Sequence, residues 1–128
     1  MIKILLIEPD RFLAEIYAQY LNDHGYKIIV CAGAQQAILA ADKALPDLVI
    51  LELQLVEHSG IEFLYEFRSY PEWLSIPVII HSQVPVSEFD TSRQLLDGQL
   101  NVKNYLYKPH NSLHDLLTAI RDLVPVTA

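Results

Sequence analysis

The stretch from Pro46 to Leu53 constrains the fold more than any other part of the chain. Its centre is a run of aliphatic and β-branched residues, typical of a strand that is buried on both faces in a parallel sheet. One carboxylate, that of Glu52, stands near the end of this run. In open α/β sheets the functional crevice lies beyond the carboxyl ends of the strands. The stretch therefore predicts a parallel sheet with Glu52 at its functional edge.

Composition narrows the class of protein. The 128 residues fit one domain, residues 1–128, and a content of 52% hydrophobic and 20% charged residues excludes a disordered chain. No apolar run approaches the roughly 18 residues of a membrane span, and the one near the N-terminus is too short for a signal peptide. The net charge of −7 disfavours direct binding to nucleic acid. The single cysteine, Cys31, cannot form an internal disulfide, so we expect it to be buried and the protein to be cytoplasmic.

Short strands and helices alternate five times along the sequence. Predicted strands cover residues 3–7, 27–31, 48–53, 77–81 and 104–107. Predicted helices run from Asp10 to His24, Ala34 to Ala44, Ile61 to Arg68, Ser87 to Leu96 and Ser112 to Val124. Residues 98–103 are expected to be a connection. The alternation predicts a parallel sheet with right-handed crossovers and helices on both faces.

Four polar side chains stand where predicted strands end. Glu8 follows the first strand, Glu52 lies on the third, Ser82 follows the fourth and Lys108 follows the fifth. If the strand order is 2-1-3-4-5, all four converge on one edge of the sheet.

With these residues the chain resembles the response-regulator receiver domain of bacterial two-component signalling. The resemblance spans nearly the whole chain and is based on residues 3–8, 46–53, 59–62, 76–82 and 105–109. It implies the flavodoxin-like fold, a doubly wound (βα)5 domain. In that family, an acidic pair after the first strand and an aspartate on the third bind Mg²⁺, and that aspartate accepts a phosphoryl group. A hydroxyl and a lysine then hold the phosphoryl group, and an aromatic residue changes rotamer.

Several positions match the family pattern. Ser82 matches the hydroxyl, Lys108 the lysine and Tyr105 the switch aromatic. Pro109 matches a proline that follows a cis peptide bond in the family, so the resemblance implies such a bond here. From the sequence alone, Tyr105 is equally well interpreted as an ordinary aromatic at the sheet edge.

Two positions depart from the family pattern, and both are positions that in the family bind Mg²⁺ or accept the phosphoryl group. Glu52 stands where the family has its phosphoacceptor aspartate, and Pro9 stands in the second place of the acidic pair. Val56 also replaces a proline usual in the following loop. Mg²⁺ needs near-ideal octahedral oxygen ligation, and in-line phosphoryl transfer depends on positioning. We therefore expect no phosphorylation of Glu52, no bound cofactor or metal, and no enzymatic activity.

Glu52 can also be interpreted as a residue with a role of its own in the switch. Its carboxylate extends one methylene further than that of aspartate, within reach of Lys108 and Ser82, and an ion pair there could hold one switch conformation permanently. A domain without any switch is an equally good interpretation. Glu8 is expected to be a partly solvated carboxylate rather than a metal ligand, and Asp10 a helix cap rather than a third carboxylate of a cation site.

Three histidines fall near the same edge: His58, His81 and His110. They lack the short ligand spacing typical of zinc sites, so we expect no metal there and place His81 in or beside the core.

The sequence thus predicts an atypical receiver domain that signals through protein–protein contact. The expected interaction face comprises Phe89, Leu95, Tyr105 and Tyr107, and a homodimer through helix 87–96, strand 104–107 and the last helix is possible. One alternative is a Mg²⁺-dependent phosphoacceptor that uses Glu8, Asp10 and Glu52. Another is a small-anion sensor in which the vacated pocket beside Lys108 binds its ligand.

Overall fold

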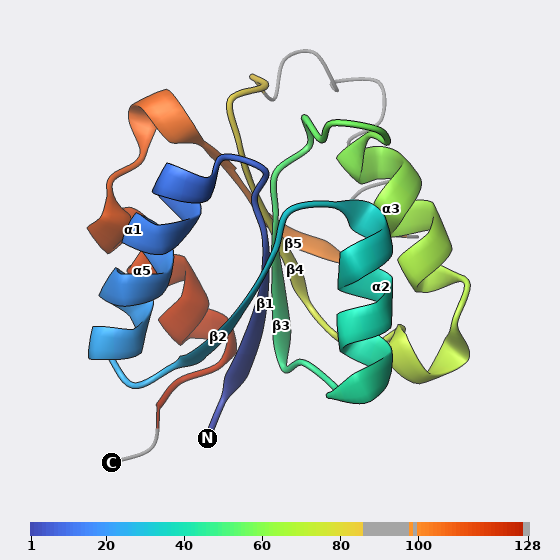
Figure 1. Ribbon diagram of the computed structural model, residues 1–128. Helices are drawn as coiled ribbons and strands as arrows, with labels where there is room; N and C mark the ends of the chain where they lie inside the picture. Colours follow the sequence, from blue (N-terminus) through green and yellow to red (C-terminus); the bar gives the residue numbers. More distant parts are fainter. Residues whose placement is uncertain (86–97, 99, 127–128) are drawn as a thin grey trace.

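The computed structural model describes residues 1–85, 98 and 100–126 (Figure 1). Five parallel strands form one sheet in the order β2-β1-β3-β4-β5, which confirms the predicted α/β fold and its strand order. The strands are β1 (Lys3–Ile7), β2 (Lys27–Cys31), β3 (Leu48–Leu51), β4 (Val78–Ser82) and β5 (Val102–Tyr107).

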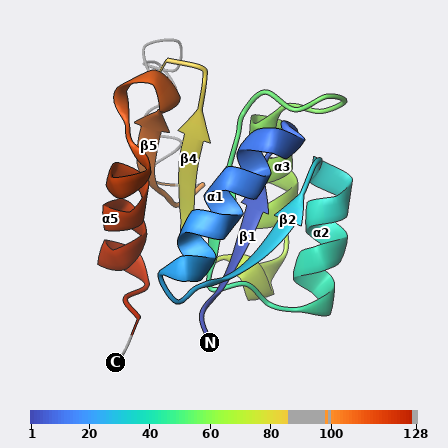
Figure 2. The same cartoon turned by 60° about the vertical axis from the view of Figure 1, so that its left-hand side comes forward.

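Helices cover both faces of this sheet. They are α1 (Arg11–Asp23), α2 (Ala34–Lys43), α3 (Gly60–Arg68) and α5 (Leu113–Leu123), with short 3₁₀ helices η1 (Pro71–Trp73) and η3 (Lys108–His110). Helices α1 and α5 lie on one face and α2 and α3 on the other (Figures 1 and 2). Each face has its own apolar core, and all four residues of β3 are buried between the two cores. In the described part of the chain, no helix is both long and apolar enough to cross a membrane.

The helix starts follow from side-chain caps. The carboxylate of Asp10 accepts a hydrogen bond from the Leu13 N–H at 3.1 Å, and Ser112 forms a reciprocal capping box with Asp115. Both predicted caps are therefore confirmed. The third predicted cap, Ser87, and the helix predicted after it lie outside the described residues.

Some strand boundaries differ from those predicted. β3 ends at Leu51, so Glu52 lies just beyond the strand, although its N–H still donates to the Ile7 carbonyl at 3.0 Å. β5 begins at Val102 rather than at Asn104, because Val102 pairs with Val78 on β4. A register shift between Val78 and Ile79 accommodates one extra residue of β5, Lys103, and nothing in the local sequence indicates such a shift.

One buried side chain fixes the start of β5. The guanidinium of Arg68, at the end of α3, donates to five carbonyl oxygens, those of Trp73, Leu74, Ile76, Leu100 and Asn101. The contacts to Leu100 and Ile76 measure 2.8 and 2.6 Å. Arg68 thereby joins the chain entering β4 to the chain entering β5. The sequence analysis missed this role and identified Arg68 only as the end of a predicted helix.

Candidate functional site

The carboxylate of Glu52 is the centre of the site. It is buried at 4% exposure and accepts hydrogen bonds from four donors: Lys108 Nζ at 2.9 Å, the N–H groups of Gln54 and Gln83 at 3.2 Å each, and Ser82 Oγ. The donors come from the loop after β3, from β4 and the residue after it, and from the end of β5. The structure thus brings Glu52, Ser82 and Lys108 together as the sequence predicted.

Lys108 lies between two carboxylates. Its ammonium contacts Glu8 Oε1 at 2.5 Å as well as Glu52, and the second oxygen of Glu8 accepts the Asp10 N–H at 3.1 Å. The side chains of Glu8 and Lys108 are 3% and 6% exposed. The expectation that Glu8 is partly solvated is therefore wrong, because Lys108 reaches back over the sheet edge and covers it.

The three charges stabilise one another. Burial raises the pKa of Glu52, but the hydrogen bonds from Ser82 and Lys108 outweigh it and hold the pKa below its ordinary value. Burial likewise lowers the pKa of Lys108, but the hydrogen bonds that its ammonium donates to Glu8 and Glu52 outweigh burial and raise that pKa above its ordinary value. At neutral pH the cluster therefore contains an ammonium shared by carboxylates.

A chain of hydrogen bonds runs from Glu52 to β5. Ser82 Oγ donates to Glu52 and accepts the Val84 N–H at 3.0 Å. The carbonyl of Val84 in turn accepts the hydroxyl of Tyr105 at 2.6 Å. The position of the Glu52 carboxylate is thus linked through Ser82 and Val84 to the side-chain direction of Tyr105, which packs half-buried against the core.

Gly60 allows the loop after β3 to close over the site. A Cβ atom on Gly60 would lie 2.7 Å from Leu53 Cα and 2.8 Å from the Glu52 carbonyl oxygen. The Gly60 N–H also donates to the Leu53 carbonyl at 2.8 Å. The start of α3 therefore rests directly on the backbone that presents Glu52, which only glycine permits.

The three histidines do not meet. His81 is buried edge-on against the Tyr17 ring, with ring centroids 5.0 Å apart, as predicted for a core histidine. His58 is exposed and bonded to Glu62, whereas His110 packs against the Tyr107 ring. Across residues 1–85, 98 and 100–126, no group of three or more histidine, cysteine or acidic side chains is placed to hold a metal ion.

The cis peptide bond expected before Pro109 is not found, because the described residues contain no cis peptide bond. Pro109 instead lies in the first turn of η3, where its fixed φ suits a helical start and its missing N–H costs no helical hydrogen bond. Of the expected interaction face, Tyr105 and Tyr107 are half-buried on β5. Phe89 and Leu95 lie outside the described residues.

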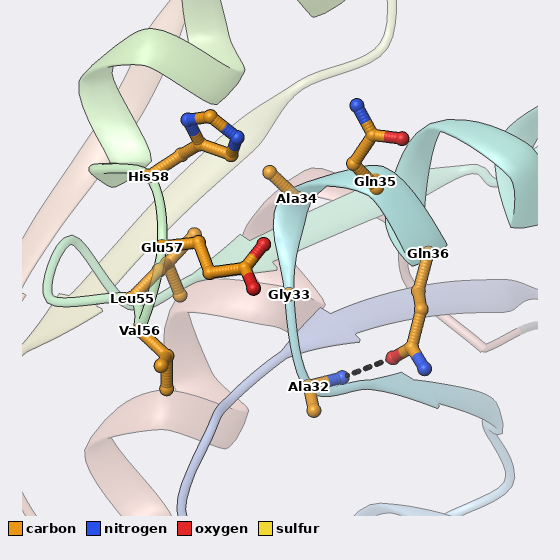
Figure 3. A pocket seen from close by; sticks show the side chains of 9 residues that line it. All are labelled: Ala32, Gly33, Ala34, Gln35, Gln36, Leu55, Val56, Glu57 and His58. Atoms are coloured by element: carbon orange, nitrogen blue, oxygen red, sulfur yellow. Dashed lines mark hydrogen bonds between the residues drawn. The ribbon is translucent and has the colours of Figure 1, made fainter.

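A separate cavity of about 280 Å³ lies beside the start of α2 (Figure 3). It is bounded by residues 32–36 and by the loop of residues 55–58, in which Val56 is 87% exposed. Glu52 and Lys108 do not line it, so this cavity is not part of the charged cluster.

Comparison with known proteins decides the family. A family model described as the response regulator receiver domain matches residues 4–121. The chain belongs to the response regulator receiver domain family. It is therefore a signalling domain of the two-component type, and such domains interact with partner signalling or output proteins.

Individual relatives support this. The transcriptional regulatory protein CpxR of Klebsiella pneumoniae is 31% identical over 124 residues, which cover 97% of this chain and 50% of that protein. The KDP operon transcriptional regulatory protein KdpE of Escherichia coli is 28% identical over 109 residues, 85% of this chain and 45% of that protein. The chain spans about half the length of these two regulators.

Solved structures show the same fold. The chemotaxis protein CheY4 of Vibrio cholerae superposes with a TM-score of 0.84 at 21% identity, covering 97% of this chain and 99% of that one.

Proposed function

We propose that this receiver domain signals by protein–protein contact without accepting a phosphoryl group, and that the Glu52 carboxylate takes the place of that group. The observation that supports this most strongly is the full set of donors around Glu52. An ammonium, a hydroxyl and two backbone N–H groups all point at its two oxygens. These are the kinds of donor that stabilise an anionic phosphoryl group.

The Glu52 carboxylate is not positioned to accept a phosphoryl group. In-line transfer requires the acceptor oxygen to lie free and aligned with the donor, since catalysis is almost entirely positioning and electrostatic stabilisation. Here both oxygens of Glu52 are engaged and the carboxylate is buried.

The residues present also fit a magnesium ion poorly. Pro9 offers no ligand where the family has a carboxylate, and Asp10 uses its side chain to cap α1. The two remaining carboxylates, Glu8 and Glu52, are bridged by the Lys108 ammonium. A dication there would face that ammonium, and Mg²⁺ demands octahedral oxygen ligation. Lys108 thus acts as the built-in counter-ion of the site.

The signal then passes to a protein partner. The Val84 N–H donates to Ser82 Oγ and the Tyr105 hydroxyl donates to the Val84 carbonyl, and these two hydrogen bonds fix the Tyr105 side chain on β5. We propose that Tyr105 and Tyr107 belong to the partner-binding face, which is held in one conformation by Glu52. The homodimer predicted through β5, α5 and the segment 87–96 remains a prediction.

The test is intact-protein mass spectrometry after incubation with Mg²⁺ and a small-molecule phosphodonor. The control is the double variant Glu52→Asp, Pro9→Asp, which restores both family carboxylates. We expect the native chain to keep its mass and the double variant to gain one phosphoryl group. A stoichiometric phosphoryl adduct on the native chain would show that it is a working phosphoacceptor and would overturn the proposal.

A separate variant, Glu52→Ala, tests the small-anion alternative. An anion that binds beside Lys108 must displace Glu52 from the same donors, so Glu52→Ala should bind inorganic phosphate if the donors form an anion site by themselves. We expect phosphate binding by the variant and not by the native chain, measured by calorimetry. Binding by the native chain would favour a sensor over a permanently occupied site.

A further inference from the structure

We propose that the outer edge of β2, together with the apolar hollow beside it, is a self-association surface at which two copies of this chain pair their β2 strands antiparallel. This inference does not depend on the proposed function, because β2 and β5 are at opposite edges of the sheet. Self-association through β2 does not use the sheet edge formed by β5.

The backbone of β2 has one unpaired side. The Lys27 N–H donates to the Ile2 carbonyl at 2.9 Å, and the Cys31 carbonyl accepts the Glu8 N–H at 3.0 Å. Because backbone groups alternate in direction along a strand, Lys27, Ile29 and Cys31 face β1, and the N–H and C=O groups of Ile28 and Val30 point outward. In the part of the chain that the structure describes, β1 is the one strand that pairs with β2.

This edge lacks the usual protection. Natural edge strands are commonly blocked by charged residues, by proline or by a bulge, since an open edge is a template for another strand. From Ile28 to Ala34 the sequence has no charged residue and no proline, and β2 pairs with β1 in unbroken register. The side chain of Val30 is 47% exposed. Only Lys27, at the start of the strand, provides a charge.

An apolar hollow of about 360 Å³ adjoins this edge on the α1 side. Its lining combines small and apolar side chains with charged ones of α1 and of the loop before it: Ala14, Ala18, Val30 and Ala32, with Glu8, Pro9, Arg11 and Glu15. Small residues on α1 leave room between the helix and the strand edge. A second copy can place apolar side chains against this hollow without moving α1.

Two β2 strands can pair antiparallel about a two-fold axis that passes between their Ile29 residues. Antiparallel pairing about this residue sets Ile28 opposite Val30 of the second copy, and the reverse pair follows by symmetry. Each of these pairs exchanges both of its outward N–H···O=C hydrogen bonds, so every outward backbone group of Ile28 and Val30 finds a partner. Their side chains, both on the α1 face, form cross-strand apolar contacts beside the hollow of each copy.

The same geometry explains why the assembly is a closed dimer and not an open filament. Isologous pairing uses the β2 edge of both copies at once, so the assembly closes as a dimer. With only two outward-facing residues, β2 can form few hydrogen bonds with a long extended peptide. The β2 strand of a second copy is equally short, so all of the outward backbone groups of both strands can be paired.

The experiment is sedimentation equilibrium of the full chain from low micromolar to about millimolar concentration. We expect a reversible monomer–dimer equilibrium that weakens about tenfold or more in Val30→Lys, because each copy then places an ammonium opposite Ile28. The matched control is Leu39→Lys, which puts the same charge on an exposed residue of α2 (62% exposed) and should leave the equilibrium unchanged. Circular dichroism of both variants verifies that they remain folded.

Amide hydrogen exchange supplies an independent readout. In the native chain the N–H groups of Ile28 and Val30 should become protected as concentration rises, whereas the already paired N–H of Ile29 should change little. A chain that stays monomeric throughout would overturn the proposal. So would a dimer that Val30→Lys leaves intact, and a dimer that Tyr107→Glu dissociates instead would assign self-association to the β5 face.

Discussion

Replacing Lys108 by methionine removes the one ammonium from the buried cluster while keeping the length of the side chain. Glu8 and Glu52 then remain, 3% and 4% exposed, with no positive charge beside them. Removing one partner from a buried ion pair costs about 3–5 kcal/mol, because the charge left behind is not solvated. Against a total stability of about 5–15 kcal/mol, this is a large fraction.

The loss should depend on pH in a defined direction. In the native chain the pKa of Glu52 is lowered, so its contribution is complete above its unfolded value of 4.5 and is lost as pH falls through the folded pKa. The pKa of Lys108 is raised, so its contribution is complete below 10.5 and is lost as pH rises through the folded pKa. In Lys108→Met burial is no longer offset by the ammonium, so the pKa of Glu52 rises and protonation of Glu52 at acid pH reduces the loss. Its deficit should therefore be largest near neutral pH and smaller near pH 4.

Urea unfolding, followed by the fluorescence of Trp73, measures this deficit at both pH values. The double variant Glu8→Gln, Lys108→Met is the control, since it removes one of the stranded carboxylates and should recover part of the loss at neutral pH. A deficit below about 1 kcal/mol, or one that is equal near neutral pH and near pH 4, would refute the account of the cluster as a mutually dependent set of charges.

Two further predictions concern other buried polar groups. Arg68→Met leaves five carbonyl oxygens without their donor, so we expect a loss of at least about 3 kcal/mol in urea unfolding, with Arg68→Lys recovering only part because an ammonium cannot span those carbonyls. A loss within about 0.5 kcal/mol would contradict the anchoring role. Burial lowers the pKa of His81 from 6.5 to about 4, so the unfolded chain binds a proton that the folded chain does not, and stability should fall by up to about 3 kcal/mol between pH 6.5 and 4. Two-dimensional NMR of the imidazole should show His81 neutral at pH 6, and a midpoint near 6.5 would contradict this prediction.

The sequence was sufficient for the fold because the information lies in periodic patterns. Five short apolar runs separated by capped helices allow few arrangements, and the order 2-1-3-4-5 brings their ends together. The meeting of Glu52, Ser82 and Lys108 followed directly from that order, since each residue stands at the end of a parallel strand.

The features that the sequence did not reveal depend on tertiary partners. The burial of Glu8 requires Lys108 to reach back across the sheet edge, which no local pattern indicates. Arg68 carries a weak signal that was available: it falls on the same helix stripe as Phe63, Leu64 and Phe67, where a charged residue must find acceptors inside the protein. The trans bond before Pro109 departs from the family pattern, so in this case the resemblance was a poor guide to local geometry.

The Arg68 guanidinium has a consequence for how this domain tolerates change. Since it binds the carbonyls of Leu100 and Asn101, the place where β5 begins is set by α3 and η1 and not by the number of residues that precede it. Insertions or deletions between residues 85 and 98 should therefore leave unchanged the register that places Lys108 beside Glu52. For protein engineering, this connection is a natural place to graft new recognition loops onto the scaffold.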